Sequence, residues 1–183
     1  MFLIVLKAVF YFLPAYVANM VPIFLARFKV WEFLNVPVDF NRKYSDGTPL
    51  VGVTKTWRGI IGGILGSMLI VLIQYFIQKY GFWNQVFLFE YSLHSILILG
   101  IYFGLGECFG DVIKSFFKRR LKIQSSAPFF PFDQLSFLGA LGLSLLYFVP
   151  EFGIILAILI LSPLVPICAN LVGFKLGLKK VWW

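Results

Sequence analysis

The chain has 183 residues, of which 60% are hydrophobic, 19% aromatic and 13% charged, and its mean hydropathy is +0.90. A soluble domain with so much apolar surface would precipitate, so the composition predicts a membrane protein. Sixteen Lys and Arg residues against eight Asp and Glu residues give a net charge of +8. In a membrane protein this excess favours anionic lipid headgroups or anionic substrates as partners, and it argues against nucleic acid.

Five apolar stretches are long enough, or nearly so, to cross the hydrocarbon core, which takes about 20 helical residues. They comprise residues 2–25, 59–78, 92–113, 135–149 and 152–174. We therefore predict an all-α fold, a polytopic membrane protein with five transmembrane helices. The first stretch lacks a basic leader and a cleavage site, so we expect it to be retained. No linker or repeat divides residues 1–183, which we interpret as one domain.

The basic residues predict the orientation of these helices. Fourteen of the sixteen fall in residues 26–58, in residues 114–134 and in the tail that contains Lys179 and Lys180. Five spans place these three segments on one face, and the positive-inside rule makes that face cytoplasmic. The N-terminus is then outside and the C-terminus cytoplasmic. Most acidic residues share this face, so we expect cytoplasmic loops to form the active site at the cell membrane.

The third apolar stretch carries ionisable residues at helical spacing. Glu107, Asp111, Lys114 and Lys118 are four, three and four residues apart, which aligns them along one helix face. Charged groups at membrane depth are costly and usually line a cavity. The alternative is a ladder of ion pairs at the membrane interface. Glycines on the second and third stretches allow close approach, either for internal packing or for a homodimer.

Asp133 follows two prolines and precedes the fourth apolar stretch. Taken alone, it is equally well interpreted as a helix N-cap. Together with Asp111 it would make a Mg²⁺ site, because magnesium is commonly held by one or two carboxylates while phosphates and water complete its shell. The only histidine, His94, lies far from these acids, so we predict no histidine base and no His/Cys metal site.

Two further segments carry candidate binding residues. Lys55 and Arg58 lie at the start of the second stretch, where free backbone N–H groups favour an anion, so they form a candidate phosphate clamp. Their alternative role is to supply positive-inside charge. Asn19 lies between Pro14 and Pro22, which indicates either a locally broken helix lining a cavity or a hydrogen bond between helices.

Carboxylates and many cations without a base suit phosphoryl-type transfer to a nucleophile that is already anionic. A phosphate nucleophile needs no deprotonation, so the main barrier is the repulsion between two polyanions. A divalent metal between Asp111 and Asp133, surrounded by cations, would offset that repulsion and stabilise a pyrophosphate leaving group.

Four segments in order carry a resemblance to a known family: PAYVANMVP (14–22), DG…KTWRG (46–59), GDVIKSFFKRR (110–120) and P-x-DQ (131–134). With these segments the chain resembles the CDP-archaeol synthases, relatives of the CDP-diacylglycerol synthases. The resemblance implies that CTP and an unsaturated archaeal ether-lipid phosphate give CDP-archaeol and pyrophosphate with Mg²⁺.

The resemblance also assigns roles to residues. It implies metal-binding and catalytic roles for Asp111 and Asp133, with Lys114 as a further catalytic residue. The substrate-binding residues that we predict are Lys55, Arg58, Lys118, Arg119, Arg120, Asn19 and Gln134. The family commonly has DQxDF where this chain has Ser136 in place of the second aspartate. Glu107 or Asp46 could compensate for that missing carboxylate.

Two other classes of protein fit less well. A CDP-alcohol phosphatidyltransferase would need a DG-x2-AR pattern, but Asp46-Gly47 continues with Thr48-Pro49-Leu50. A transporter or lipid-binding module would place polar groups near the midplane of the membrane. In this chain the acids cluster toward one surface.

Overall fold

The computed structural model describes residues 1–124 and 127–175; Lys179 and Lys180 lie outside this part of the chain. Within it the chain forms helices and no strand beyond isolated bridges. The α-helices are α1 (Phe2–Arg27), α2 (Trp57–Lys79), α3 (Leu93–Arg120), α4 (Phe137–Ser144), α5 (Phe152–Leu161) and α6 (Leu164–Lys175). Three 3₁₀ turns are η1 (Glu32–Leu34), η2 (Asn84–Val86) and η3 (Phe132–Gln134).

Three helices, α1, α2 and α3, are long and apolar enough to cross a membrane, and α5 is a shorter apolar helix. The prediction of an all-helical membrane protein is therefore confirmed. α1 runs without a break through Pro14 and Pro22, so the interpretation of this segment as a locally broken helix is wrong. Helices buried in a membrane tolerate proline because their neighbours compensate for the lost backbone hydrogen bond.

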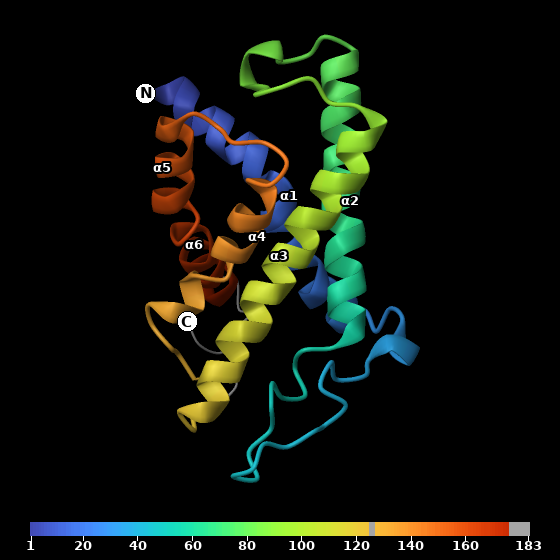
Figure 1. Cartoon of the computed structure of the whole chain (residues 1–183), viewed down its shortest axis with the longest axis vertical. Coiled ribbons are helices and arrows are strands. Elements are labelled where there is room, and N and C mark those ends of the chain that lie inside the picture. Colours follow the sequence, from blue (N-terminus) through green and yellow to red (C-terminus); the bar gives the residue numbers. More distant parts are fainter. Residues whose placement is uncertain (125–126, 176–183) are drawn as a thin grey trace.

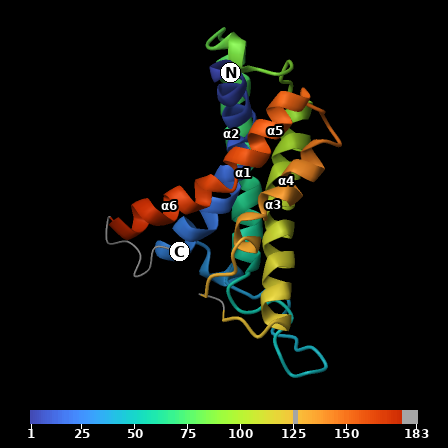
Figure 2. The same ribbon diagram turned by 90° about the vertical axis from the view of Figure 1, so that its left-hand side faces the viewer.

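The last two apolar stretches are helical but less regular than the first three. α4 has only eight residues and is followed by a turn that leads to Pro150. The stretch 152–174 is not one continuous helix: it breaks at Ser162 and Pro163 into α5 and α6. Figure 2 shows α6 projecting away from the bundle. A proline inside a helix removes one N–H donor and clashes with the preceding turn, which explains a break at this position.

Glycines allow the helices to pack closely inside the chain. A Cβ atom on Gly63 of α2 would meet the backbone of Ala18 on α1, and one on Gly104 of α3 would meet the backbone of Ile64 on α2. Gly106, also on α3, lies against the backbone of α4. The glycine faces of α2 and α3 therefore serve internal packing, one of the two roles that the sequence allowed.

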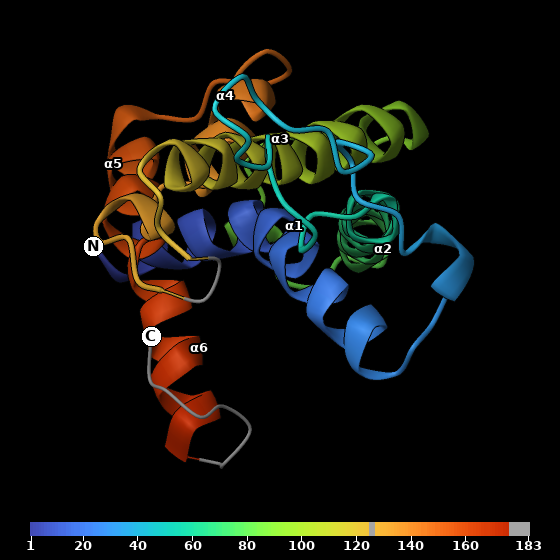
Figure 3. The same cartoon turned by 90° about the horizontal axis from the view of Figure 1, so that it is seen from below.

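The basic segments lie at one end of the bundle. Figure 1 shows the loop between α1 and α2 and the segment that follows α3 at the same end, with the η2 loop at the other. Figure 3, viewed from the first end, shows the α1–α2 loop passing across the end of α3. The first end carries the candidate site residues.

The α1–α2 loop is held in place by Asp39, which is nearly buried. Its Oδ2 atom accepts hydrogen bonds from the amides of Val51 (2.8 Å) and Gly52 (3.0 Å), and its Oδ1 atom accepts one from Asn41 (3.0 Å). Burial alone would raise the pKa of an acid, but these donors outweigh it and hold the pKa of Asp39 below its ordinary value. Arg119 fastens the same loop to α3, because its Nε atom donates to the carbonyl oxygen of Val51 (3.4 Å).

Candidate active site

Asp111 lies between two lysines that come from different elements. Lys55, just before α2, donates to Asp111 Oδ2, and the Nζ atom of Lys114 lies 2.7 Å from Asp111 Oδ1. The side chain of Asp111 is 28% exposed. Each carboxylate oxygen thus faces an ammonium group, and the cluster is still accessible from outside the bundle.

Asp133 lies in η3 and faces a third lysine. Its two carboxylate oxygens are 3.2 and 3.3 Å from Lys118 Nζ, and Oδ2 also accepts a hydrogen bond from the amide of Phe129 (2.7 Å). The N-cap interpretation is wrong, because Ser136 is the residue that precedes α4. Asp133 instead closes the turn that begins at Phe129.

Lys114 connects these two groups. Its ammonium contacts the carboxylate of Asp111 and also donates to the backbone oxygen of Asp133 (3.3 Å). One side chain therefore bridges the two aspartates, although the carboxylate of Asp133 is turned toward Lys118. The structure brings together five of the predicted site residues, which are Lys55, Asp111, Lys114, Lys118 and Asp133.

Glu107 lies one turn before Asp111 on α3 and is only 4% exposed. Its Oε1 atom accepts hydrogen bonds from Asn19 Nδ2 (2.5 Å) and from Ser136 Oγ (2.8 Å). Asn19 therefore makes the hydrogen bond between helices that the sequence offered as an alternative. Of the two acids that could compensate for the serine at position 136, Glu107 is the one in contact with it.

Arg58 pairs with a different acid from Lys55. It is 7% exposed, and its Nη1 atom is 3.0 Å from Glu32 Oε1 in η1. Lys55 and Arg58 thus have different partners, Asp111 and Glu32, and their role as a phosphate clamp stays a prediction. Sequence spacing gave no signal for the Glu32 partner, which is 26 residues away.

Arg120 binds the α1–α2 loop. Its Nη2 atom donates to the backbone oxygen of Pro49 (2.5 Å), its Nη1 atom is 3.4 Å from Asp46 Oδ1, and its guanidinium lies 4.4 Å from the centre of the Tyr44 ring. The hydroxyl and amide of Thr48 hold the pKa of Asp46 below its ordinary value. Asp46 is thus part of a loop turn, with Thr48 and Arg120 as its partners.

Gln134 adds an unused acceptor next to Asp133. In the part of the chain that the structure describes, its side-chain oxygen is buried and has no hydrogen-bond partner. Buried acceptors are normally satisfied, and an exception needs an explanation. A hydroxyl or amino donor of a bound substrate would satisfy this one.

The oxygen donors of this cluster suit magnesium that arrives with phosphate. Among the described residues there is no group of three or more His, Cys, Asp or Glu side chains that could hold a metal alone. The carboxylate of Asp111 and the backbone oxygen of Asp133 contact Lys114 instead, and the carboxylate of Asp133 faces Lys118. This donor set fits Mg²⁺, for which one or two carboxylates suffice when the substrate supplies further oxygens.

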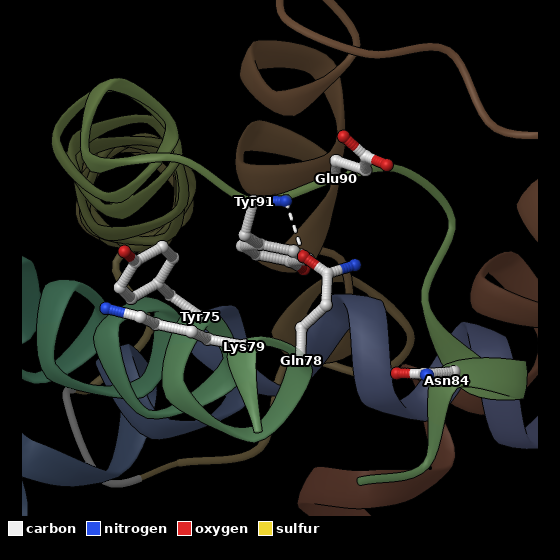
Figure 4. Close-up of a pocket in the computed structure, with 6 residues that line it drawn as sticks. All are labelled: Tyr75, Gln78, Lys79, Asn84, Glu90 and Tyr91. Atoms are coloured by element: carbon white, nitrogen blue, oxygen red, sulfur yellow. Dashed lines mark hydrogen bonds between the residues drawn. The ribbon is translucent and has the colours of Figure 1, made fainter. Parts of the chain in front are cut away.

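A hollow of about 480 Å³ lies at the other end of the bundle, between α2 and the η2 loop (Figure 4). Gln78 connects its two sides: it donates to the carbonyl oxygen of Phe89 (2.9 Å) and accepts from the amide of Tyr91 (2.6 Å). Burial raises the pKa of the Tyr91 hydroxyl above its ordinary value. This hollow is part of the loop's attachment and lies away from the aspartates.

Comparison with known proteins identifies the family of the chain. A sequence model of the family described as CDP-archaeol synthase matches residues 1–183. Among the most similar relatives is a CDP-archaeol synthase of Pyrococcus horikoshii, 37% identical over 97% of this chain and 96% of its own length. Another, from Methanococcus maripaludis, is 36% identical over 99% of this chain and 98% of its own length.

A solved structure described as an intramembrane enzyme for archaeal membrane lipid biosynthesis also matches. It has a TM-score of 0.70 and 26% sequence identity, and the match covers 91% of this chain and 94% of that one. These matches disfavour the transporter and phosphatidyltransferase alternatives. With a match along the whole sequence and relatives above 30% identity, the chain belongs to the CDP-archaeol synthase family.

Proposed function

We propose that the cluster around Asp111 and Asp133 is where this membrane cytidylyltransferase joins CTP to an archaeal ether-lipid phosphate, giving CDP-archaeol and pyrophosphate. Family membership supports the reaction. The observation that supports the place is the bridge by Lys114 between the two aspartates, flanked by Lys55 and Lys118. A site with several cations suits two substrates that are both polyanions.

The residues of the cluster fit the demands of this reaction. An oxygen of the lipid phosphate attacks the α-phosphorus of CTP, and the bond from that phosphorus to the β-phosphate oxygen breaks, so that pyrophosphate leaves. The nucleophile is already anionic and needs no base. Lys55, Lys114 and Lys118 each hold a carboxylate in the absence of substrate, and we expect them to transfer to phosphate oxygens when substrate binds.

We propose Asp111 and Asp133 as the residues that hold Mg²⁺. When bound, this ion would neutralise charge on the phosphates. The lysines that face the two carboxylates hold them in place until then. Gln134, whose side-chain oxygen has no partner among the described residues, is next to Asp133 in the chain. Asn19 donates to Glu107, which lies one turn before Asp111.

We also propose that residues 1–183 form a single domain that crosses the membrane five times, with the N-terminus outside and the active site and C-terminus in the cytoplasm. The concentration of basic residues at the active-site end supports this orientation. A homodimer stays a prediction, although the glycines of α2 and α3 that suggested it are used inside the chain.

The test is an assay of purified protein with CTP, Mg²⁺ and an archaeal ether-lipid phosphate, in which pyrophosphate release is measured. Asp111→Asn and Asp133→Asn should each lower kcat/KM by about a hundredfold or more, since each removes a charge from the site. Glu90→Gln is the matched control, because Glu90 is an exposed carboxylate on the opposite end of the bundle. Thermal unfolding in detergent checks that each variant is folded. Normal turnover in an aspartate variant would remove that residue from the site.

A further inference from the structure

Glu107 is a buried acidic side chain that the proposed metal-binding pair does not include. It is 4% exposed and lies four residues before Asp111 on α3, about one helical turn deeper in the bundle. A buried carboxylate is destabilising unless it is hydrogen-bonded or paired with a charge. The groups around Glu107 therefore indicate why the fold accepts it.

Two donors from different elements meet on one oxygen of Glu107. Asn19 of α1 and Ser136, at the start of α4, both donate to Oε1. Gly110, one turn further along α3, lets the backbone of Ser136 lie directly against the helix, where a Cβ atom would collide with it. Glu107 thus fastens the segment that begins at η3, and hence Asp133, to α3 and α1.

The charges of the cluster give Glu107 a second role. Three ammonium groups, from Lys55, Lys114 and Lys118, face only two carboxylates. Glu107 lies close enough to Asp111 and Lys114 to interact with both charges. In its ionised form, Glu107 would bring the acids to three, equal to the three lysines, before any substrate binds.

We infer that Glu107 is the third carboxylate of the site, a positioning residue that holds the Asp133 segment through Ser136 and balances the charge of the lysines. The third carboxylate therefore comes from α3, and Ser136 contributes only a hydrogen bond to it. This inference rests on the function proposed above.

Glu107→Gln separates the charge from the hydrogen bonds. Because both donors reach Oε1, the amide oxygen of glutamine can accept the same two bonds. The variant should therefore unfold at the wild-type temperature. Because the site gains one net positive charge, the variant should need several-fold more Mg²⁺ for half-maximal activity. For the same reason it should bind CTP several-fold more tightly without divalent cations. Calorimetric titration with CTP in a chelating buffer measures the last property without turnover.

Relocating the carboxylate tests the contact itself. Ser136→Asp alone places two carboxylates against each other and should lower kcat/KM about tenfold or more. Glu107→Ala removes the carboxylate and should lower kcat/KM by a similar factor. The double variant Glu107→Ala/Ser136→Asp has one carboxylate on the other side of the same contact and should regain most of the activity.

Two results would overturn the inference: a Glu107→Gln protein with wild-type Mg²⁺ requirement and wild-type metal-free CTP affinity, or a double variant no more active than the single variants. These are distinguishable from failure of the proposed function. An inactive wild-type protein, or normal activity of Asp111→Asn and Asp133→Asn, would contradict the proposed function instead.

Discussion

Lys55 and Arg58 are three residues apart, and at the level of single residues their partners predict different effects of mutation. Lys55 donates to Asp111, whereas Arg58 is paired with Glu32. Lys55→Ala should raise the KM for CTP about tenfold, because a charged hydrogen bond contributes about 1.5–3 kcal/mol. Steady-state kinetics over a range of CTP concentrations measures this.

Arg58→Ala should act on stability. Arg58 is buried, so Arg58→Ala removes a packed side chain together with its ion pair to the half-exposed Glu32, and we expect a lower unfolding temperature and a nearly unchanged KM for CTP. Glu32→Gln is the matched control and should shift stability in the same direction. A large rise in the KM for CTP with Arg58→Ala would show instead that Arg58 binds a phosphate of CTP.

Asp39 predicts how the α1–α2 loop responds to pH. Its pKa in the folded protein is lowered, so its ionised form stabilises the loop at neutral pH. That contribution is lost as the pH falls through the ordinary value for aspartate and then through the lowered one. Hydrogen exchange of the amides of Val51 and Gly52, corrected for intrinsic rates, should show protection falling over this range.

Asp39→Asn should remove that pH dependence. Asparagine has only one acceptor oxygen, and its amide group would face an N–H donor, so protection of the loop should fall about tenfold or more at neutral pH. Asp46→Asn is the control, because Asp46 belongs to a different, exposed turn. Equal protection in wild type and Asp39→Asn would contradict the role of Asp39.

Sequence spacing predicted part of this site and could not predict the rest. The intervals between Asp111, Lys114 and Lys118 fix their shared face, since that follows from helical geometry alone. The contact between Glu107 and Ser136 depends on how deeply α4 packs against α3, which no local pattern encodes. The pairing of Arg58 with Glu32 likewise depends on the path of the loop.

At the level of whole elements, the backbone at the start of α4 lies directly against α3, and this contact predicts the effects of a matched pair of glycine variants. Gly110→Ala would place a Cβ against the backbone of Ser136. Backbone cannot move away as a flexible side chain can, so we expect a loss of about 2 kcal/mol or more and displacement of the Asp133 segment. Both the unfolding temperature in detergent and kcat/KM should fall.

Gly142→Ala is the control on α4 itself. No atom lies within 4 Å of a Cβ built there. Alanine favours a helix over glycine by up to about 1 kcal/mol, so this variant should be neutral or slightly more stable. Similar losses in both variants would show that helix flexibility, and not the close contact, matters.

The helices themselves were predictable to different degrees. Hydropathy located all the apolar stretches, because each must either cross the hydrocarbon core or pack against a helix that crosses it. Prolines were ambiguous: α1 continues through Pro14 and Pro22, whereas the helix breaks at Pro163. Pro14 is fully buried, whereas Pro22 and Pro163 are both partly buried, so burial of the proline alone does not separate the two outcomes.

The whole molecule has two chemically different ends. The end with the site gathers Arg120, Lys118 and the other basic residues of the two loop segments, whereas the opposite end carries Lys79 and exposed aromatic residues such as Trp83. Such asymmetry orients a protein in a membrane, because basic segments stay on the cytoplasmic side. In the proposed orientation, the cation-rich site would face the cytoplasm, from which CTP would reach it.

This orientation predicts which loops a membrane-impermeant maleimide can reach. In a background with Cys108→Ala and Cys168→Ala, Asn84→Cys in the η2 loop should be labelled on intact cells, because that end faces outward. Ser45→Cys, exposed at the tip of the α1–α2 loop, should be labelled only after the membrane is opened. Labelling of both in detergent controls for reactivity. Labelling of Ser45→Cys on intact cells would invert the topology and place the CTP-binding end outside, where a cytoplasmic nucleotide could not reach it.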